Sequence, residues 1–297
     1  MNRRIMLVAA ASVLLGCVVL GLKALAWYVT GSVALLSDAL ESIINVVASA
    51  VALVALAVSA RPADEGHPYG HTKAEYLSAV VEGVLVIIAA ITILREAWFG
   101  FLNPQLPDDP WQGMMLNGLA TIINAVWCWY LMRLGRRYRS PALKADAKHL
   151  LADVITSIGV LAGFVLVPLT GWAQLDSIIA GLVALNILWM GWGLMRESIG
   201  GLMDEAAPAE TVERLRQLVK QNAGSAMEAH DLRTRHAGRL TFVEFHLVVA
   251  GEMKVVEAHA ICDRIEKAIH EEMEDTIITI HIEPESEAQR LDSVMVF

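Results

Sequence analysis

Charged residues are scarce in this chain of 297 residues: they make up 19% of the sequence, against 56% hydrophobic residues. Such a composition excludes intrinsic disorder and an ordinary water-soluble domain, so membrane insertion is the expected class. Positive charge is also short, and the formal net charge of -9 argues against a nucleic-acid partner, because phosphate binding needs a basic surface. The three cysteines, Cys17, Cys128 and Cys262, are scattered, which predicts no disulfide framework.

Long apolar runs are what the sequence has in abundance. About 20 apolar residues cross a bilayer as a helix. Six windows are long enough: residues 5–28, 33–59, 76–98, 111–134, 149–170 and 175–195. The first is longer than the core of a signal peptide and further spans follow it directly, so we expect it to be retained as a membrane span.

Basic residues are confined to alternate loops. Arg and Lys lie before span one, after spans two and four, and after span six, while the other three loops contain neither. Positively charged loops remain in the cytoplasm. We therefore expect a multi-pass protein of the cell membrane with an even number of spans and both termini cytoplasmic.

The sequence changes character after Asp204. Helical periodicity predicts helices over residues 209–222 and 254–272, and alternation predicts strands over 229–235, 240–249 and 276–283. This order suggests a small α+β sandwich. The chain thus divides into a six-helix membrane domain (1–203), a cytoplasmic domain (204–290) and a loose polar tail (291–297).

Two of the predicted spans carry polar residues that are costly in lipid. Span two contains Asp38, Glu41 and Asn45, and span five contains His149 and Asp153. Residues four apart lie on one helix face, one turn from each other. Two such helices facing each other would present two carboxylates, an imidazole and an amide oxygen, which suits a divalent cation.

An alternative is that these acids pair with a basic side chain or cap a local break in a helix. Neither span two nor span five has a deep basic residue, since Lys144 and Lys148 lie at the rim. We therefore expect the gap between the two spans to contain no basic side chain and to bind a cation from outside the chain. Asp38 either lines an entrance or is solvated, and Glu82 and Asn124 are interpreted as packing or pathway residues.

The loop after span two holds a second cluster. Asp64, His67 and His71 lie in a segment shaped by glycine and proline, where two imidazoles four residues apart and a carboxylate can surround one ion. Solvated loop histidines are the alternative interpretation.

The soluble domain holds a third cluster. His246 lies on a strand whose alternate residues face a core, while His281 and Glu283 share one face of the last predicted strand. His230 begins the first strand and His259 lies on the second helix. A strand-face pair with an acidic partner and further histidines nearby points to metal binding.

These segments together resemble the cation diffusion facilitator family, especially its bacterial zinc/proton antiporters. The resemblance covers nearly the whole chain and is carried by residues 31–42, 61–75, 149–153, 230–235 and 281–284. The most specific of them is the His-Pro-Tyr-Gly-His-x-Lys-x-Glu motif at residues 67–75.

The resemblance implies a homodimer of six-span protomers, each with a cytoplasmic ferredoxin-like domain, and a transport site between spans two and five. The implied metal ligands are Glu41, Asn45, His149 and Asp153 in the membrane, Asp64, His67 and His71 in the loop, and His230, His246, His259, His281 and Glu283 in the cytoplasmic domain. Lys73 and Asp204 match a charge pair near the membrane surface.

The resemblance also implies a function, which is export of Zn(II) or a related ion (Fe(II), Mn(II), Co(II), Ni(II) or Cd(II)) in exchange for protons across a bacterial inner membrane. Metal is then both substrate and regulator. Asn45 stands where the antiporters have an aspartate and carries no proton, which makes His149 the expected proton carrier. A non-transporting metal receptor or scaffold is the alternative. We expect no enzyme, because the only His-Glu pair, His270-Glu271, lacks the second histidine of an intramembrane metalloprotease.

Overall fold

A computed structural model describes residues 3–30, 33–103, 111–172, 174–273, 275–288 and 294–295. The chain divides into two compact units, Met1–Ile199 and Gly200–Phe297. Each unit has its own architecture.

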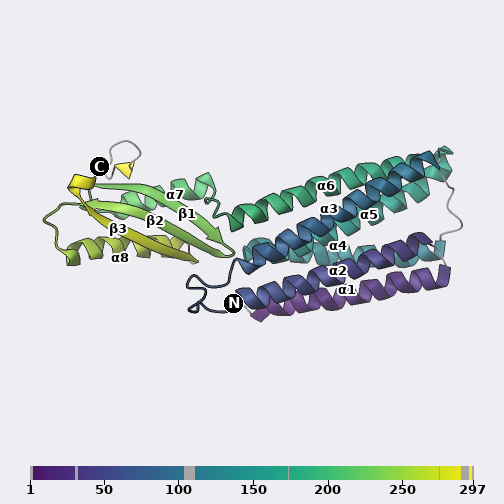
Figure 1. Ribbon diagram of the computed structural model, residues 1–297, viewed down its shortest axis with the longest axis horizontal. Coiled ribbons are helices and arrows are strands. Elements are labelled where there is room, and N and C mark those ends of the chain that lie inside the picture. Colours follow the sequence, from purple (N-terminus) through teal and green to yellow (C-terminus); the bar gives the residue numbers. More distant parts are fainter. Residues whose placement is uncertain are drawn as a thin grey trace. The chain divides into compact units, whose positions relative to one another are not determined.

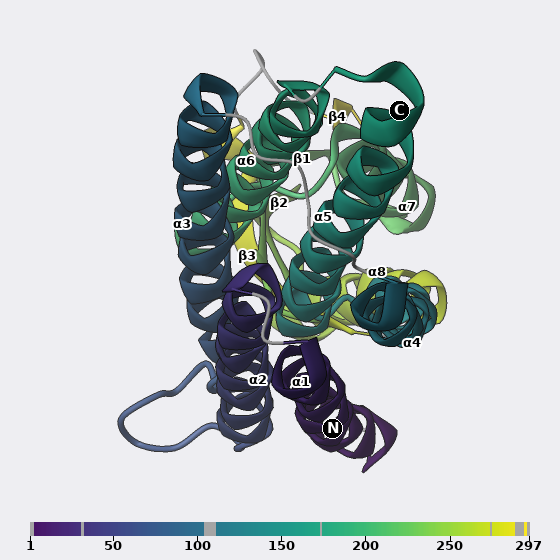
Figure 2. The same ribbon diagram turned by 90° about the vertical axis from the view of Figure 1, so that its right-hand side faces the viewer.

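The first unit is a bundle of long helices that run side by side (Figures 1 and 2). Their bounds are α1 Arg3–Thr30, α2 Val33–Ser59, α3 Ala74–Leu102, α4 Trp111–Arg137, α5 Pro141–Thr170 and α6 Gln174–Leu202. A continuous helix satisfies every backbone polar group internally, which lipid demands. Within the described residues, four stretches are long and apolar enough to cross a membrane: Ile5–Leu25, Ser42–Ser59, Ala74–Leu102 and Ser177–Leu202.

Helix α5 is as long as these and carries charged residues in its first half. Helix α5 begins at Pro141, eight residues before the window chosen by hydropathy, and its first half includes Lys144, Asp146 and Lys148. The helix continues through these residues because their polar groups find partners: both oxygens of Asp146 accept hydrogen bonds from serine hydroxyls, Ser12 at 2.6 Å and Ser49 at 2.7 Å. The helix therefore extends beyond the apolar window at this end.

Helices α3 and α6 approach each other through glycines. A Cβ at Gly83 would lie 3.4 Å from the backbone nitrogen of Met195, and one at Gly191 would lie 3.0 Å from the side chains of Val86 and Ile87. Small residues allow membrane helices to pack by close van der Waals contact, where lipid removes the hydrophobic driving force. Large apolar side chains such as Leu14 and Trp189 are exposed, as lipid-facing residues would be.

The second unit is an α+β sandwich (Figure 1). Its elements are α7 Ala209–Asn222, β1 Glu228–Ala237, β2 Leu240–Val249, α8 Val255–Glu272, β3 Thr276–Pro284, the short 3-10 helix η1 Glu285–Glu287 and β4 Val294–Met295. The sheet order is β3-β2-β1-β4, with β2 parallel to β3 and the other pairs antiparallel.

One face of this sheet forms the core with both helices. Alternate residues of β2, Val243, Phe245 and Leu247, are buried against Leu215 of α7 and Ile265 of α8. The expected α+β fold is confirmed, and α7 and β2 have the predicted bounds. One expectation was wrong: residues 294–295 of the predicted loose tail pair with β1 as a short edge strand.

Replacing Ile265 with Ala should lower the free energy of unfolding of this unit by about 2–5 kcal/mol, because it removes buried methyl groups and leaves a cavity. Cys262, which is 5% exposed, reports the opening. Its alkylation should accelerate in a full-length chain in which Cys17 and Cys128 are replaced by Ala. Val255→Ala, at a side chain 81% exposed, is the control. Equal rates for the two variants would contradict this view of the core.

Candidate metal sites

The membrane unit brings two predicted ligands into direct contact. His149 of α5 donates from Nε2 to Oδ1 of Asn45 on α2 at 2.6 Å. Both residues are buried, with 6% and 5% exposure. The other side-chain nitrogens, His149 Nδ1 and Asn45 Nδ2, have no hydrogen-bond partner among the described residues. Burying a polar atom without a hydrogen-bond partner costs free energy, so this point in the bundle has room for a further polar or ionic partner.

Asp153 lies one turn further along α5 and binds a cation of the chain itself. Lys23 of α1 places Nζ 3.0 Å and 3.3 Å from the two carboxylate oxygens. Asn124 of α4 donates to the same carboxylate at 2.5 Å. The side chains of Lys23 and Asp153 are 1% and 4% exposed. The expectation of a gap without a basic side chain was therefore wrong, because it considered only spans two and five, whereas Lys23 comes from span one.

Glu41 and Asp38 fall on α2, but their side chains lie outside the described part of the structure. Glu41 as a ligand stays a prediction. Asn124, interpreted from sequence as a packing or pathway residue, is a direct partner of Asp153.

Other buried acids in the bundle have serine partners. Glu75 accepts from Ser59 at 2.9 Å and from Ser140. Glu82 is fully buried and accepts from Ser78 at 3.3 Å, while its Oε2 has no partner among the described residues. These groups are separate from the His149 and Asp153 contacts.

The loop cluster forms as the sequence predicted. One ligand atom from each of Asp64, His67 and His71 lies within 4.8 Å of the others. The backbone N–H of His67 donates to Asp64 Oδ1 at 2.7 Å, and this bond is the main cause that lowers the pKa of the Asp64 carboxyl below its ordinary value. Gly70 completes the turn with φ +83°, a conformation that favours glycine. The three groups could hold one ion.

The soluble unit aligns three predicted histidines across its sheet. Strand register pairs His230 of β1 with His246 of β2, and His246 with His281 of β3. The ring centroids are 5.2 Å apart for the first pair and 4.9 Å for the second. Side chains at paired register positions lie on the same face of a sheet, so one face carries all three imidazoles.

Glu283 joins two of these histidines. Its carboxylate oxygens lie 3.2 Å from His230 Nε2 and 2.9 Å from His246 Nδ1. Both ring nitrogens of His230 lie at ion-pair distance from a carboxylate, but neither has the geometry of a hydrogen bond. The same holds for Glu283 Oε2, which faces His230 Nε2. The polar atoms of these side chains thus converge on one point without forming hydrogen bonds to one another. His230, His246 and Glu283 could hold one ion.

Two acidic neighbours of this cluster were not predicted from the sequence. Glu228 lies two residues before His230 on β1 and places Oε1 3.2 Å from its Nδ1. Asp231 lies 4.0 Å from His246 Nε2, at a break in the register where it adopts φ +53°. Alternation along β1 could have indicated Glu228, but the position of Asp231 depends on an irregularity that alternation does not predict.

Two further predictions concern His259 and Asp204. His259 is exposed on α8, 3.7 Å from Asp263, and does not belong to the cluster that the described residues form. Asp204 accepts from Arg235 of β1 at 3.3 Å. A pair between Asp204 and Lys73 stays a prediction.

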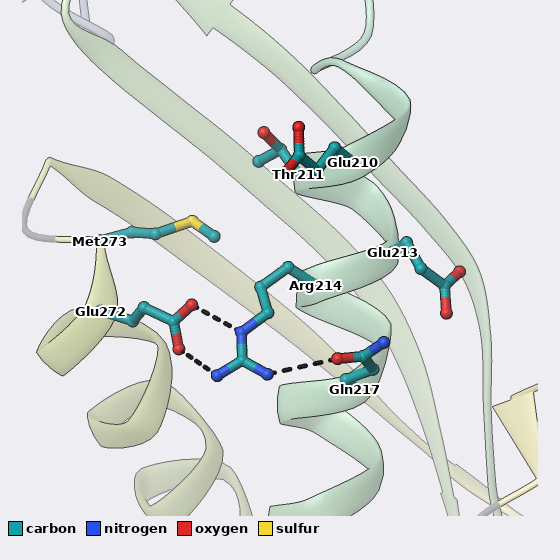
Figure 3. A pocket seen from close by; sticks show the side chains of 7 residues that line it. All are labelled: Glu210, Thr211, Glu213, Arg214, Gln217, Glu272 and Met273. Atoms are coloured by element: carbon teal, nitrogen blue, oxygen red, sulfur yellow. Dashed lines mark hydrogen bonds and ion pairs between the residues drawn. The ribbon is translucent and has the colours of Figure 1, made fainter.

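A surface groove of roughly 480 Å³ lies between α7 and α8 (Figure 3). Arg214 extends across it and donates to both oxygens of Glu272, at 2.6 Å and 2.7 Å. The guanidinium lowers the pKa of Glu272, and the carboxylate raises that of Arg214. Since these charges satisfy each other, the groove is not the metal site.

Comparison with known proteins identifies the family. Residues 8–203 match the family model of the cation efflux transmembrane domain, and residues 207–285 match that of the cation efflux protein cytoplasmic domain. The chain belongs to the cation efflux family. The resemblance to cation diffusion facilitators is thereby confirmed, and the chain is a multi-pass membrane protein of a transporter family.

Relatives extend over most of the chain. The "Uncharacterized transporter sll1263" of Synechocystis is 42% identical, over 89% of this chain and 86% of that protein. The "Cation-efflux pump FieF" of Escherichia coli is 29% identical, over 93% of this chain and 91% of that protein. Among solved structures, the Zn form of the putative zinc transporter CzrB is 48% identical, over 29% of this chain and 99% of that one, with a TM-score of 0.28.

Replacing Glu283 with Gln should weaken Zn(II) binding in the soluble unit by at least about tenfold, because the amide lacks the charge that both histidines face. Equilibrium dialysis of the full-length chain should show fewer tightly bound ions per protomer. Glu271→Gln, at an exposed glutamate of α8, serves as the matched control. Unchanged binding after Glu283→Gln would exclude this cluster.

Replacing Asp64 with Asn should loosen the loop turn, because the N–H of His67 loses its charged acceptor. Amide exchange at residues 64–71, corrected for intrinsic rates, should accelerate relative to Glu65→Gln. Since the folded pKa of Asp64 is depressed, the bond is present above the ordinary pKa of about 3.9 and is lost as pH falls through the lowered value. Protection that is the same for both variants at neutral pH would contradict this.

Proposed function

We propose that this chain is a divalent-cation/proton antiporter that exports Zn(II) or a related transition metal from the cytoplasm. The observation that carries the proposal is the contact between His149 and Asn45, with Asp153 one turn away. Imidazole, amide and carboxylate groups buried within a helix bundle are the ligands that several divalent transition metals accept. A relative over most of the chain, named as a cation-efflux pump, supports the same substrate class.

The incomplete hydrogen bonding at this point supports a transient ligand. His149 Nδ1 and Asn45 Nδ2 are buried without partners among the described residues. Intramembrane ionisable residues of this kind mark pathways for ions or protons. Glu41, one turn from Asn45 on α2, would supply the second carboxylate.

Proton exchange follows from the chemistry of the ligands. A histidine must be neutral to bind metal, so metal binding and proton binding at His149 exclude each other. Metal from the cytoplasm would displace a proton. After the bundle rocks to expose the site outward, protonation of His149 would release the ion. Asn45 takes no part in this step, because an amide does not titrate.

Metal bound at the clusters outside the helix bundle would regulate transport. Metal bound by His230, His246 and Glu283 would stabilise one arrangement of the soluble unit and so shift the population towards the transporting homodimer. In this proposal both termini lie in the cytoplasm, as the distribution of basic residues predicts, so the soluble unit would bind cytoplasmic metal.

Purified protein in liposomes with an imposed pH gradient tests the proposal. His149→Ala and Asp153→Ala should each reduce Zn(II) flux by at least about tenfold, because each removes a ligand. Ser198→Ala is the matched control, since among the described residues its buried hydroxyl bonds only to the carbonyl of Leu194 in the same helix. A fluorescent Zn(II) indicator inside the vesicles gives the rate.

Unchanged flux in both variants would contradict the assigned transport site. Absence of flux in the wild type, together with a metal-dependent change in the soluble unit, would favour the metal receptor instead. Competition between Zn(II), Fe(II), Mn(II), Co(II), Ni(II) and Cd(II) in the same assay identifies the preferred ion.

A further inference from the structure

The side chain of Lys23 supplies a positive charge within the proposed transport site, where it contacts Asp153. Its Nζ contacts both oxygens of the Asp153 carboxylate, at 3.0 Å and 3.3 Å. The pair is almost completely buried. Helix α1 thereby contributes to a site that the ligands of α2 and α5 alone would not suggest.

The ammonium and a bound metal compete for one carboxylate. Lys23 contacts both oxygens of Asp153, and Asn124 donates to one of them, so a metal would have to share this carboxylate with a full positive charge. A divalent ion between Glu41 and Asp153 would balance their two negative charges, so an ammonium left in contact would add an uncompensated positive charge in a medium of low dielectric. Two cations so close repel, and one must withdraw.

Lys23 has the means to withdraw. Its ammonium sits on a flexible four-carbon stem with several rotatable bonds, so the charge can move off the carboxylate while the stem stays packed in the bundle. The pairing can thus open without unfolding the helix.

We propose that Lys23 is a built-in counter-cation that takes the Asp153 carboxylate whenever metal leaves, so that the empty carrier returns across the membrane without a bare buried charge. It acts through Asp153 and is a positioning residue of the transport cycle. The inference rests on the proposed function. It predicts opposite effects on two quantities: the competitor weakens metal binding, and it speeds the return of the empty carrier.

Metal binding and turnover should therefore move in opposite directions in Lys23→Gln. Without the competing ammonium, Zn(II) affinity of the membrane site should rise at least about tenfold, the lower end of the coupling measured between close charges. The maximal exchange rate should fall, because the empty carrier keeps an unpaired carboxylate. Lys23→Arg should restore both values towards wild type.

Affinity is measured by equilibrium dialysis of the full-length chain. The chain also carries His71→Ala and His246→Ala, which remove the loop cluster and the cluster of the soluble unit. Turnover is measured in liposomes as maximal rate and half-saturating concentration. Lys144→Gln is the matched control, since that lysine of the same domain pairs with Glu197 at 3.4 Å, away from Asp153. It should change neither quantity.

Unchanged or weaker Zn(II) affinity in Lys23→Gln would overturn the proposal, including when flux falls, because a purely structural lysine gives that result. A misfolded variant would bind less metal, so a gain in affinity also reports an intact site. If the wild type binds metal but shows no flux, the proposed function fails, while the affinity comparison still decides whether Lys23 and metal compete.

Discussion

A buried carboxylate in a lipid environment must have a partner, and Asp153 shows how this bundle meets the constraint. Helices α1, α4 and α5 each contribute a group to one small polar cluster. Removing one member of a buried ion pair typically costs about 3–5 kcal/mol, because the remaining charge has no water to solvate it. The arrangement of these three helices is therefore linked to the charge state of a single side chain.

The same constraint explains why the bundle contains so many serines at helix contacts. Asp146 accepts from hydroxyls of Ser12 and Ser49 on neighbouring helices, and Glu75 accepts from Ser59 of α2 and from Ser140, which precedes α5. Each of these acids is tied to two other points in the chain. Serine supplies hydrogen-bond donors to these acids without adding a positive charge.

Sequence reasoning predicted the parts of this molecule that repeat with a regular period. Strand β2 and helix α7 follow alternation and helical periodicity over their whole length, and their bounds agree with the structure. The contact of Lys23 with Asp153 has no such signal, since residues 130 positions apart in sequence meet only through helix packing. A hydropathy window remains apolar when it contains one lysine, and the count of basic residues in loops, which predicted the orientation, does not include residues inside a span.

The three clusters differ in their access to water, and this follows from their positions in the fold. Asp64 and His67 are more than half exposed, His230 is buried beside Glu283, and His149 is enclosed by helices. An ion exchanges readily with solvent at the first and needs local motion at the last. The loop is thus suited to capture, and the bundle to occlusion.

The histidine row of the soluble sheet exists only in one strand alignment. Because successive side chains of a strand point to opposite faces, sliding β1 or β3 by a single residue would turn His230, or His281 together with Glu283, into the apolar layer beneath. In a chain with mispaired strands the imidazoles and the carboxylate would not converge, so this cluster of possible ligands forms only together with the native strand pairing.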